Sequence, residues 1–271
     1  MHLRRAMPGV AIVATLALIT VAAPAGAADE DPPLEECTIV GTEGNDTLEG
    51  TDGPDVICGL GGRDRIYGFD GDDRLYGGDD PDMIFGGPGA DTIYGGAGND
   101  FARGCFGEDE IHGGDGDDYL VSCGCGCTAE LAFDASLYGE AGDDNLRGSD
   151  GDDRLYGGLG DDYIKGFNAN DTVVGGAGND ELFGGPGNDQ LRGYQGHDKL
   201  QGGSGNDELS GGLGRDIITG GGGRDTLNGD KGKDTLAAKD GQRDVVRGGP
   251  GVDRGRWDRG KDRVRSVEKR Q

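Results

Sequence analysis

The chain has 271 residues, and 60 of them are Gly, a share well above the average of roughly 7%. Only 33% of the residues are hydrophobic, 6% are aromatic, and the formal net charge is -26. These values are typical of a disordered or low-complexity chain and argue against an ordinary enzyme domain. A polyanion repels phosphate, so the composition also argues against nucleic acid as a partner and favours cations.

The first 27 residues have the features of a secretory signal peptide. Two arginines, Arg4 and Arg5, precede an apolar run over residues 10–23, and Ala-Gly-Ala at 25–27 supplies the small residues before a cleavage site. The apolar run is short for a bilayer core of roughly 30 Å. We therefore predict cleavage after Ala27 and a secreted, extracellular protein without membrane insertion after cleavage. An uncleaved membrane anchor is the alternative.

The glycines recur with a period of nine residues. Nine consecutive nonamers run from residue 41 to 121, and eleven more run from 139 to 237. Position 1 is Gly and position 6 is Asp in all twenty nonamers. Position 4 is Gly except at Asp80 and Ala169, and position 8 is a larger aliphatic residue except at Ala102. Such regularity is not an accident of composition, and a repeat of this length indicates a solenoid or an array.

Each slot of the nonamer has a physical interpretation. Gly at positions 1, 2 and 4 permits positive φ and tight turning, and the Asp at position 6 closes the turn. Positions 7–9 form a minimal strand with one aliphatic side chain facing inward. Nothing repeats at 3.6 residues, so a helix is excluded. Two nonamers then make one coil, coils stack at roughly 4.8 Å, and residue i lies beside residue i+18. The sequence thus predicts an all-β solenoid of stacked repeats.

The repeat G-G-x-G-x-D-x-U-x resembles the RTX-type (hemolysin-type) calcium-binding nonapeptide repeat of secreted bacterial proteins, and the resemblance covers residues 41–237. It implies a parallel β-roll in which Ca²⁺ lies between the turns of successive coils, held by Asp carboxylates and turn carbonyls. Ca²⁺ takes six to eight oxygen ligands and accepts carbonyls, which agrees with a Gly-rich turn that ends in Asp.

The position-6 carboxylates are the predicted calcium ligands. Sites that pair residue i with i+18, such as Asp46 with Asp64 and Asp55 with Asp73, would hold about sixteen Ca²⁺ ions and offset most of the acidic charge. The predicted ligands are Asp46, Asp55, Asp64, Asp73, Asp82, Asp91, Asp100, Asp109, Asp118, Asp144, Asp153, Asp162, Asp171, Asp180, Asp189, Asp198, Asp207, Asp216, Asp225 and Asp234.

The same resemblance and the charge together predict a chain that is largely unfolded without calcium. It would fold on binding the ion, with an affinity near the extracellular range of about 10⁻⁴ to 10⁻³ M. The alternative is a calcium-independent Gly-rich coil stack in which Asp only closes turns.

Six cysteines fit an exported protein with disulfides. A bridge between Cys37 and Cys58 would tie down the N-terminal edge of the stack, where a sheet is otherwise exposed. Cys105 is expected to pair with one member of a cluster at Cys123, Cys125 and Cys127. The connectivity stays open, and so does a zinc site, although C-x-C-x-C lacks the usual C-x₂-C spacing.

The repeats divide the chain into six segments. These are a signal peptide (1–27), a lead-in (28–40), a first β-roll block of nine repeats (41–121), a Cys-rich irregular break (122–138), a second block of eleven repeats (139–237), and degenerate repeats with a basic C-terminal cap (238–271). In the cap, Asp244, Asp253 and Asp262 keep the Asp slot, whereas Gly255 stands in the inward slot. Trp257 is expected to cover the final coil. The break could alternatively be a binding loop, and the basic tail could contact an anionic surface.

Little in the sequence would support catalysis. His112 and His197 stand in ordinary repeat slots, and no G-x-S-x-G, P-loop or EF-hand order occurs. We therefore expect no enzyme but a secreted calcium-binding repeat protein whose β-roll folds on binding many ions. The alternative is an extracellular adhesin that presents outward aromatic side chains to an unidentified surface partner. These aromatics are Tyr67, Tyr76, Phe85, Tyr94 and Tyr156, and a contiguous aromatic row would favour that alternative.

Overall fold

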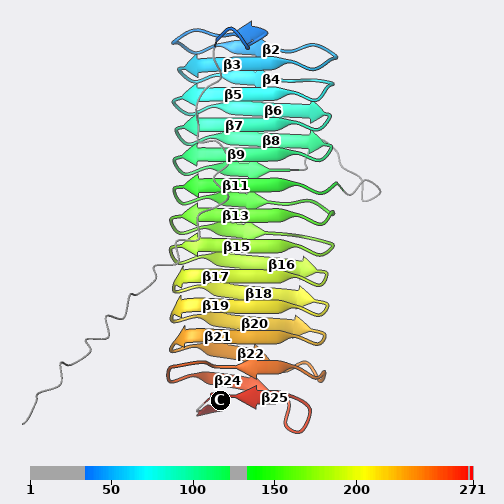
Figure 1. The fold of residues 1–271 in the computed structure, drawn as a ribbon, viewed down its shortest axis with the longest axis vertical. Helices are drawn as coiled ribbons and strands as arrows, with labels where there is room; N and C mark the ends of the chain where they lie inside the picture. Colours follow the sequence, from blue (N-terminus) through cyan, green and yellow to red (C-terminus); the bar gives the residue numbers. More distant parts are fainter. Residues whose placement is uncertain (1–33, 123–132, 268, 271) are drawn as a thin grey trace, which may run out of the picture.

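The computed structural model describes residues 34–122, 133–267 and 269–270. Within these residues the chain forms only strands and turns, wound into coils that stack along one axis (Figure 1). The predicted all-β solenoid is confirmed. None of the described residues belongs to a helix that could cross a membrane. The predicted signal peptide and the cluster Cys123, Cys125 and Cys127 lie outside the described residues.

The strands form two parallel sheets of 13 strands each, and successive strands alternate between the sheets. The odd sheet consists of β1 (Ile39–Val40), β3 (Val56–Gly61), β5 (Arg74–Asp79), β7 (Thr92–Ala97), β9 (Glu110–Asp115), β11 (Ser136–Ala141), β13 (Arg154–Leu159), β15 (Thr172–Ala177), β17 (Gln190–Gly196), β19 (Glu208–Gly214), β21 (Thr226–Gly232), β23 (Val245–Arg247) and β25 (Arg263–Arg265). The even sheet consists of β2 (Thr47–Glu49), β4 (Arg65–Tyr67), β6 (Met83–Pro88), β8 (Phe101–Phe106), β10 (Tyr119–Val121), β12 (Asn145–Arg147), β14 (Tyr163–Lys165), β16 (Glu181–Pro186), β18 (Lys199–Ser204), β20 (Ile217–Gly222), β22 (Thr235–Ala238), β24 (Arg254–Trp257) and β26 (Lys269–Arg270).

The register confirms that two nonamers make one coil. In the odd sheet Leu75 pairs with Ile93, which lies eighteen residues further along the chain. At the irregular break the spacing widens, because Leu137 pairs with Ile111 on one side and with Leu155 on the other. Both sheets therefore continue across the break, and Leu137 takes an ordinary inward slot.

Most strands are longer than the predicted triplet at positions 7–9. In β5 and β7 the pairing continues beyond Leu75 and Ile93 to Gly78 and Gly96, at position 2 of the following nonamers. Gly78 has a φ of 106°, so the backbone bends there without leaving the ladder. The expectation of three-residue strands is correct for short strands such as β2 and wrong for the six-residue strands.

The core is a double column built from one side chain per repeat. These position-8 side chains are buried in all coils between the ends: Ile57, Ile66, Leu75, Ile84, Ile93, Ala102, Ile111, Leu120, Leu137, Leu146, Leu155, Ile164, Val173, Leu182, Leu191, Leu200, Leu209, Ile218, Leu227, Leu236 and Val246. At the two ends Leu48 and Val264 are only partly buried and pack against this column. Burial of each aliphatic side chain contributes roughly 1.5–3 kcal/mol before the entropy cost.

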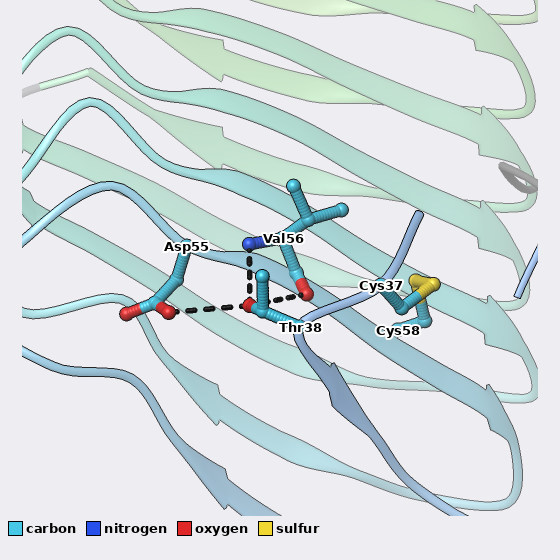
Figure 2. Close-up of a disulfide and its surroundings, with 5 residues drawn as sticks. All are labelled: Cys37, Thr38, Asp55, Val56 and Cys58. Atoms are coloured by element: carbon cyan, nitrogen blue, oxygen red, sulfur yellow. Dashed lines mark hydrogen bonds between the residues drawn. A yellow bond between two sulfur atoms is a disulfide. The ribbon is translucent and has the colours of Figure 1, made fainter. Parts of the chain in front are cut away.

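The N-terminal edge is held by the predicted disulfide. Cys37 and Cys58 are bonded, with their Cα atoms 6.0 Å apart (Figure 2). The bridge ties the two-residue edge strand β1 to the next strand of the odd sheet, β3. Cys105 is disulfide-bonded as well, and its predicted partners lie outside the described residues.

The C-terminal end closes with an aromatic ring. Gly255 pairs with Leu236 in the even sheet and leaves the inward slot without a side chain. Ring carbons of Trp257 lie 3.2 and 3.3 Å from the point where a Cβ of Gly255 would stand. The indole therefore lies against Gly255 and covers the slot, as predicted from the sequence.

The two leucines of β13 provide a test of the core. Leu155 is fully buried, whereas Leu159 is 61% exposed. We predict that Leu155→Ala lowers the free energy of unfolding by about 2–5 kcal/mol because it leaves a cavity in the column. Leu159→Ala should change it by less than about 0.5 kcal/mol. Denaturant unfolding followed by circular dichroism in saturating calcium measures both, and equal losses would contradict this description of the core.

Candidate metal centre

The position-6 residues form two rows along the solenoid. The even row precedes the even-numbered strands and contains Asp46, Asp64, Asp82, Asp100, Asp118, Asp144, Asp162, Asp180, Asp198, Asp216, Asp234 and Asp253. The odd row precedes the odd-numbered strands and contains Asp55, Asp73, Asp91, Asp109, Asp153, Asp171, Asp189, Asp207, Asp225, Asp244 and Asp262. In the odd row Ala135 stands between Asp109 and Asp153, so one carboxylate is missing.

Each row is a ladder in which one aspartate contacts the next. The backbone N–H of Asp46 donates to Oδ1 of Asp64 at 2.8 Å, and that of Asp55 donates to Oδ1 of Asp73 at 2.8 Å. The same contact recurs along both rows. The predicted stacking of residue i on residue i+18 is thereby confirmed for these pairs.

The ladder of the even row also crosses the irregular break. The N–H of Asp118 donates to Oδ1 of Asp144 at 2.8 Å, although 26 residues separate them. The predicted number of about sixteen sites, which considers each block of repeats separately, does not include this contact. It also omits the contacts that Asp244, Asp253 and Asp262 make at the C-terminal end. Their retention of the Asp slot in degenerate repeats was the sequence signal for them.

The second carboxylate oxygen, Oδ2, lacks a protein partner in most of these turns. Oδ2 is buried and, within the described residues, without a hydrogen-bond partner in Asp64, Asp73, Asp82, Asp91, Asp109, Asp118, Asp144, Asp162, Asp171, Asp180, Asp189, Asp198, Asp207, Asp216, Asp225, Asp234, Asp244 and Asp253. These side chains are at most 2% exposed. Burying a charged oxygen without a donor lowers the stability of the folded state, so each of these atoms needs a proton or a cation as a partner.

A second oxygen lies close to Oδ2 in most of these turns. A Cβ added to Gly68 would overlap both Oδ2 of Asp73 and the carbonyl oxygen of Gly86 in the next coil. The same three-way contact occurs at position 1 along both rows, for example around Gly157. A carboxylate oxygen and a carbonyl oxygen therefore lie near each other over most position-1 glycines, in a space that any side chain at position 1 would fill.

This geometry corrects the predicted role of the first glycine. Positive φ occurs at positions 2 and 4 of the nonamer, whereas Gly68 and the other described position-1 glycines do not adopt it. Position 1 requires Gly for space rather than for conformation. At position 4, Asp80 and Ala169 keep the positive φ of the glycines they replace, with values of 74° and 72°. The turn geometry is thus preserved where the glycine is lost.

The donor set fits calcium better than zinc. Among the described residues, no group of three or more His, Cys, Asp or Glu side chains is placed to hold a metal by itself. An ion in these turns would need carbonyl oxygens in addition to carboxylate, which Ca²⁺ accepts, whereas Zn²⁺ prefers nitrogen and sulfur ligands. The ion pairs His112–Glu110, His112–Glu140 and Lys199–Glu181 lie outside the two rows.

Burial dominates the electrostatics of the rows. Burial raises the pKa of Asp109 to about 8, and the neighbouring Asp91 carboxylate adds to the rise. Burial likewise raises the pKa of Asp162 to about 8 and that of Asp82 to about 7. At Asp55 burial acts in the same direction, but hydrogen bonds from threonines outweigh it and the pKa is lowered. The interior rows thus favour neutral carboxyl groups unless positive charge is supplied.

These shifts predict how the metal-free roll responds to pH. A carboxyl group whose pKa is raised by folding stabilises the folded state below its unfolded pKa of about 4 and loses this effect as pH rises through the folded pKa. For values of about 6 to 8, calcium-free protein should be most stable near pH 4 and lose β structure between pH 6 and 8. Circular dichroism of metal-stripped protein against pH measures this. Stability that increases with pH over that range would contradict the description of the rows.

Comparison with known proteins agrees with the geometry. No curated protein matches the chain. The family described as RTX calcium-binding nonapeptide repeat (4 copies) matches residues 40–68, 67–102, 103–122, 132–164, 165–200 and 201–236. These matches cover most of the chain and include the repeats whose Asp rows are described above. The chain belongs to the RTX calcium-binding nonapeptide-repeat family.

Proposed function

We propose that this is a secreted protein whose β-roll folds on binding many Ca²⁺ ions between stacked turns. One observation carries the proposal: along both rows, a buried Oδ2 without a donor lies near a carbonyl oxygen of the next coil over most position-1 glycines. The twenty predicted aspartates, from Asp46 to Asp234, are the candidate ligands, although in Asp46, Asp55 and Asp153 a backbone N–H already donates to Oδ2. Asp244 and Asp253, which are buried in the same ladder, extend the set.

The number of ions follows from the stacking. Pairing residue i with i+18 inside each block predicts about sixteen Ca²⁺. The contact between Asp118 and Asp144 and those near the C-terminus would add sites, and the missing carboxylate at Ala135 removes none of the counted pairs because it lies between the blocks. The two blocks, 41–121 and 139–237, remain a proposal as separate units, since both sheets pass between them.

Folding and calcium binding should be coupled. Without a cation, neighbouring carboxylates of one row repel each other at short range in a poorly solvated environment. Each bound ion supplies the charge that the row lacks, and a site assembled from two coils does not exist in the unfolded chain. The resident ion would thus act as a structural link between coils.

Export is supported by two features of the chain. The N-terminal segment has signal-peptide character, and the Cys37–Cys58 disulfide suits an oxidising compartment. The family is one of calcium-binding repeats, and we propose that the protein has no catalytic activity of its own.

A surface-interaction role is the second candidate, and an aromatic row favours it. On the odd sheet, rings stack face to face at centroid distances of 4.7 to 5.2 Å in the order Tyr76, Tyr94, His112, Tyr138 and Tyr156. The row is contiguous, as an adhesin would need. Each ring covers the face of the next, however, so the row offers mainly ring edges to a partner. Calcium-dependent folding is therefore the better-supported function.

Circular dichroism with and without calcium tests the proposed function. At neutral pH we predict a largely unfolded spectrum in EGTA and a β spectrum when Ca²⁺ is added at about 10⁻⁴ to 10⁻³ M or above. Mg²⁺ at the same ionic strength is the control, because it requires a near-octahedral site and retains its waters. An unchanged β signal in EGTA at neutral pH would refute calcium-dependent folding.

A further inference from the structure

The residue at position 2 divides the turns of the roll into two kinds. In most described nonamers position 2 has a positive φ, for example 106° at Gly78, 89° at Phe167 and 74° at Tyr194. Among the nonamers, positive φ is not found at position 2 in four turns, those of Thr42, Thr51, Ser149 and Asp258. The ten-residue repeat before Asp244 has positive φ at Gly241 instead, and within the described residues Oδ2 of Asp244 has no donor. For a β-branched residue such as Thr, positive φ is a genuine outlier, so the residue type itself opposes the common conformation.

The two kinds of turn treat the carboxylate differently. Where φ is not positive, the position-2 N–H donates to Oδ2 of the aspartate four residues later: Thr42 to Asp46 at 2.6 Å, Thr51 to Asp55 at 2.7 Å, Ser149 to Asp153 at 2.5 Å and Asp258 to Asp262 at 2.6 Å. The hydroxyls of Thr42 and Thr51 add a second donor to the same oxygen. In a positive-φ turn the N–H of Phe167 instead donates to the carbonyl of Gly184, at 3.0 Å.

We call a turn closed when its position-2 N–H donates to Oδ2 and open when it does not. Three of the closed turns lie where a row begins. Among the described residues, Asp46 is the first member of the even row and Asp55 the first of the odd row, and no described aspartate is stacked before either of them. At Asp55 the hydroxyl of Thr38 lies 3.2 Å from Oδ1 and takes the place of the missing coil (Figure 2). The lead-in segment therefore completes the first turn of the odd row.

The third closed turn stands directly after the gap in the odd row. The N–H of Ala135 donates to Oδ1 of Asp153 at 2.8 Å, and the N–H of Ser149 donates to Oδ2. The Ser149 hydroxyl donates to the carbonyl of Phe133 at 2.6 Å and fixes the turn against the preceding coil. Both oxygens of Asp153 are thus satisfied by the protein. In Asp171, the next member, Oδ2 has no such partner.

We propose that the protein itself closes these turns and that calcium enters only the turns in which no position-2 N–H donates to Oδ2. Each row, and the restarted odd row after Ala135, then begins on a metal-independent turn. The even row carries one continuous array of sites, and the odd row carries two. The inference rests on the proposed calcium function but adds a claim that the function does not require: aspartates in the same slot differ in whether they bind the ion.

A pair of isosteric substitutions in neighbouring repeats separates the two kinds of turn. Asp153→Asn changes a closed turn, and Asp162→Asn changes an open one. The number of bound ions is counted by native mass spectrometry and by equilibrium dialysis with Ca²⁺ at saturation. We expect Asp162→Asn to lose at least one ion relative to wild type. We expect Asp153→Asn to keep the wild-type number while its thermal midpoint falls, because one carboxylate oxygen is replaced by an amide group that faces a donor.

Each outcome has a distinct meaning. Equal losses of ions in the two variants, or no loss in Asp162→Asn, would overturn the division of the turns while leaving calcium binding intact. A wild-type protein that binds no calcium would instead refute the proposed function. If either variant does not fold in calcium, the comparison is repeated with Asp55→Asn, at a closed turn, and Asp73→Asn, at an open turn. Both of these turns belong to the odd row. Ser204→Ala, at an exposed position 3, controls for an unrelated substitution.

Discussion

The structure depends on carboxylates that are buried at regular intervals with only one oxygen satisfied by the protein. In an interior turn such as that of Asp171, the amide of the preceding coil holds Oδ1, and Oδ2 is buried without a donor. Such an arrangement is unfavourable once and becomes more so when it is repeated along a row. The roll can therefore be compact only when protons or cations supply the missing charge. The family assignment identifies calcium as the cation.

The rest of the nonamer serves this arrangement. Gly at position 1 leaves room for Oδ2 and for the carbonyl of the next coil, and positive φ at positions 2 and 4 carries the chain around the turn. The aliphatic residue at position 8 fills a core only one side chain wide per repeat. A core of this size leaves little margin against the entropy of ordering so much Gly-rich chain. This small margin is the reason why we propose that metal binding and folding are coupled.

The sequence was sufficient to predict the period, the eighteen-residue stacking, the inward column and the aspartate pairs, because each follows from one residue type in one slot. It was not sufficient for features that depend on contacts between coils. The space requirement at Gly68 involves Gly86 of the next coil, and the extension of the strands through Gly78 depends on pairing with Gly96. The contact between Asp118 and Asp144 could not be predicted, because the irregular break does not show which residues on its two sides pair with each other. Three of the four closed turns did have a sequence signal, Thr or Ser at position 2, but only the structure shows that their N–H donates to Oδ2. The fourth had none, because Asp stands at position 2 both there, as Asp258, and in a positive-φ turn, as Asp230.

The most direct test of this account is a crystal structure of the mature protein grown in calcium, with anomalous data that locate the ions. We predict anomalous peaks beside Oδ2 of interior aspartates such as Asp162 and Asp171, each also in contact with a carbonyl oxygen. Metal-free turns around the same β-roll, with the aspartates unchanged, would show that the buried rows do not require a cation.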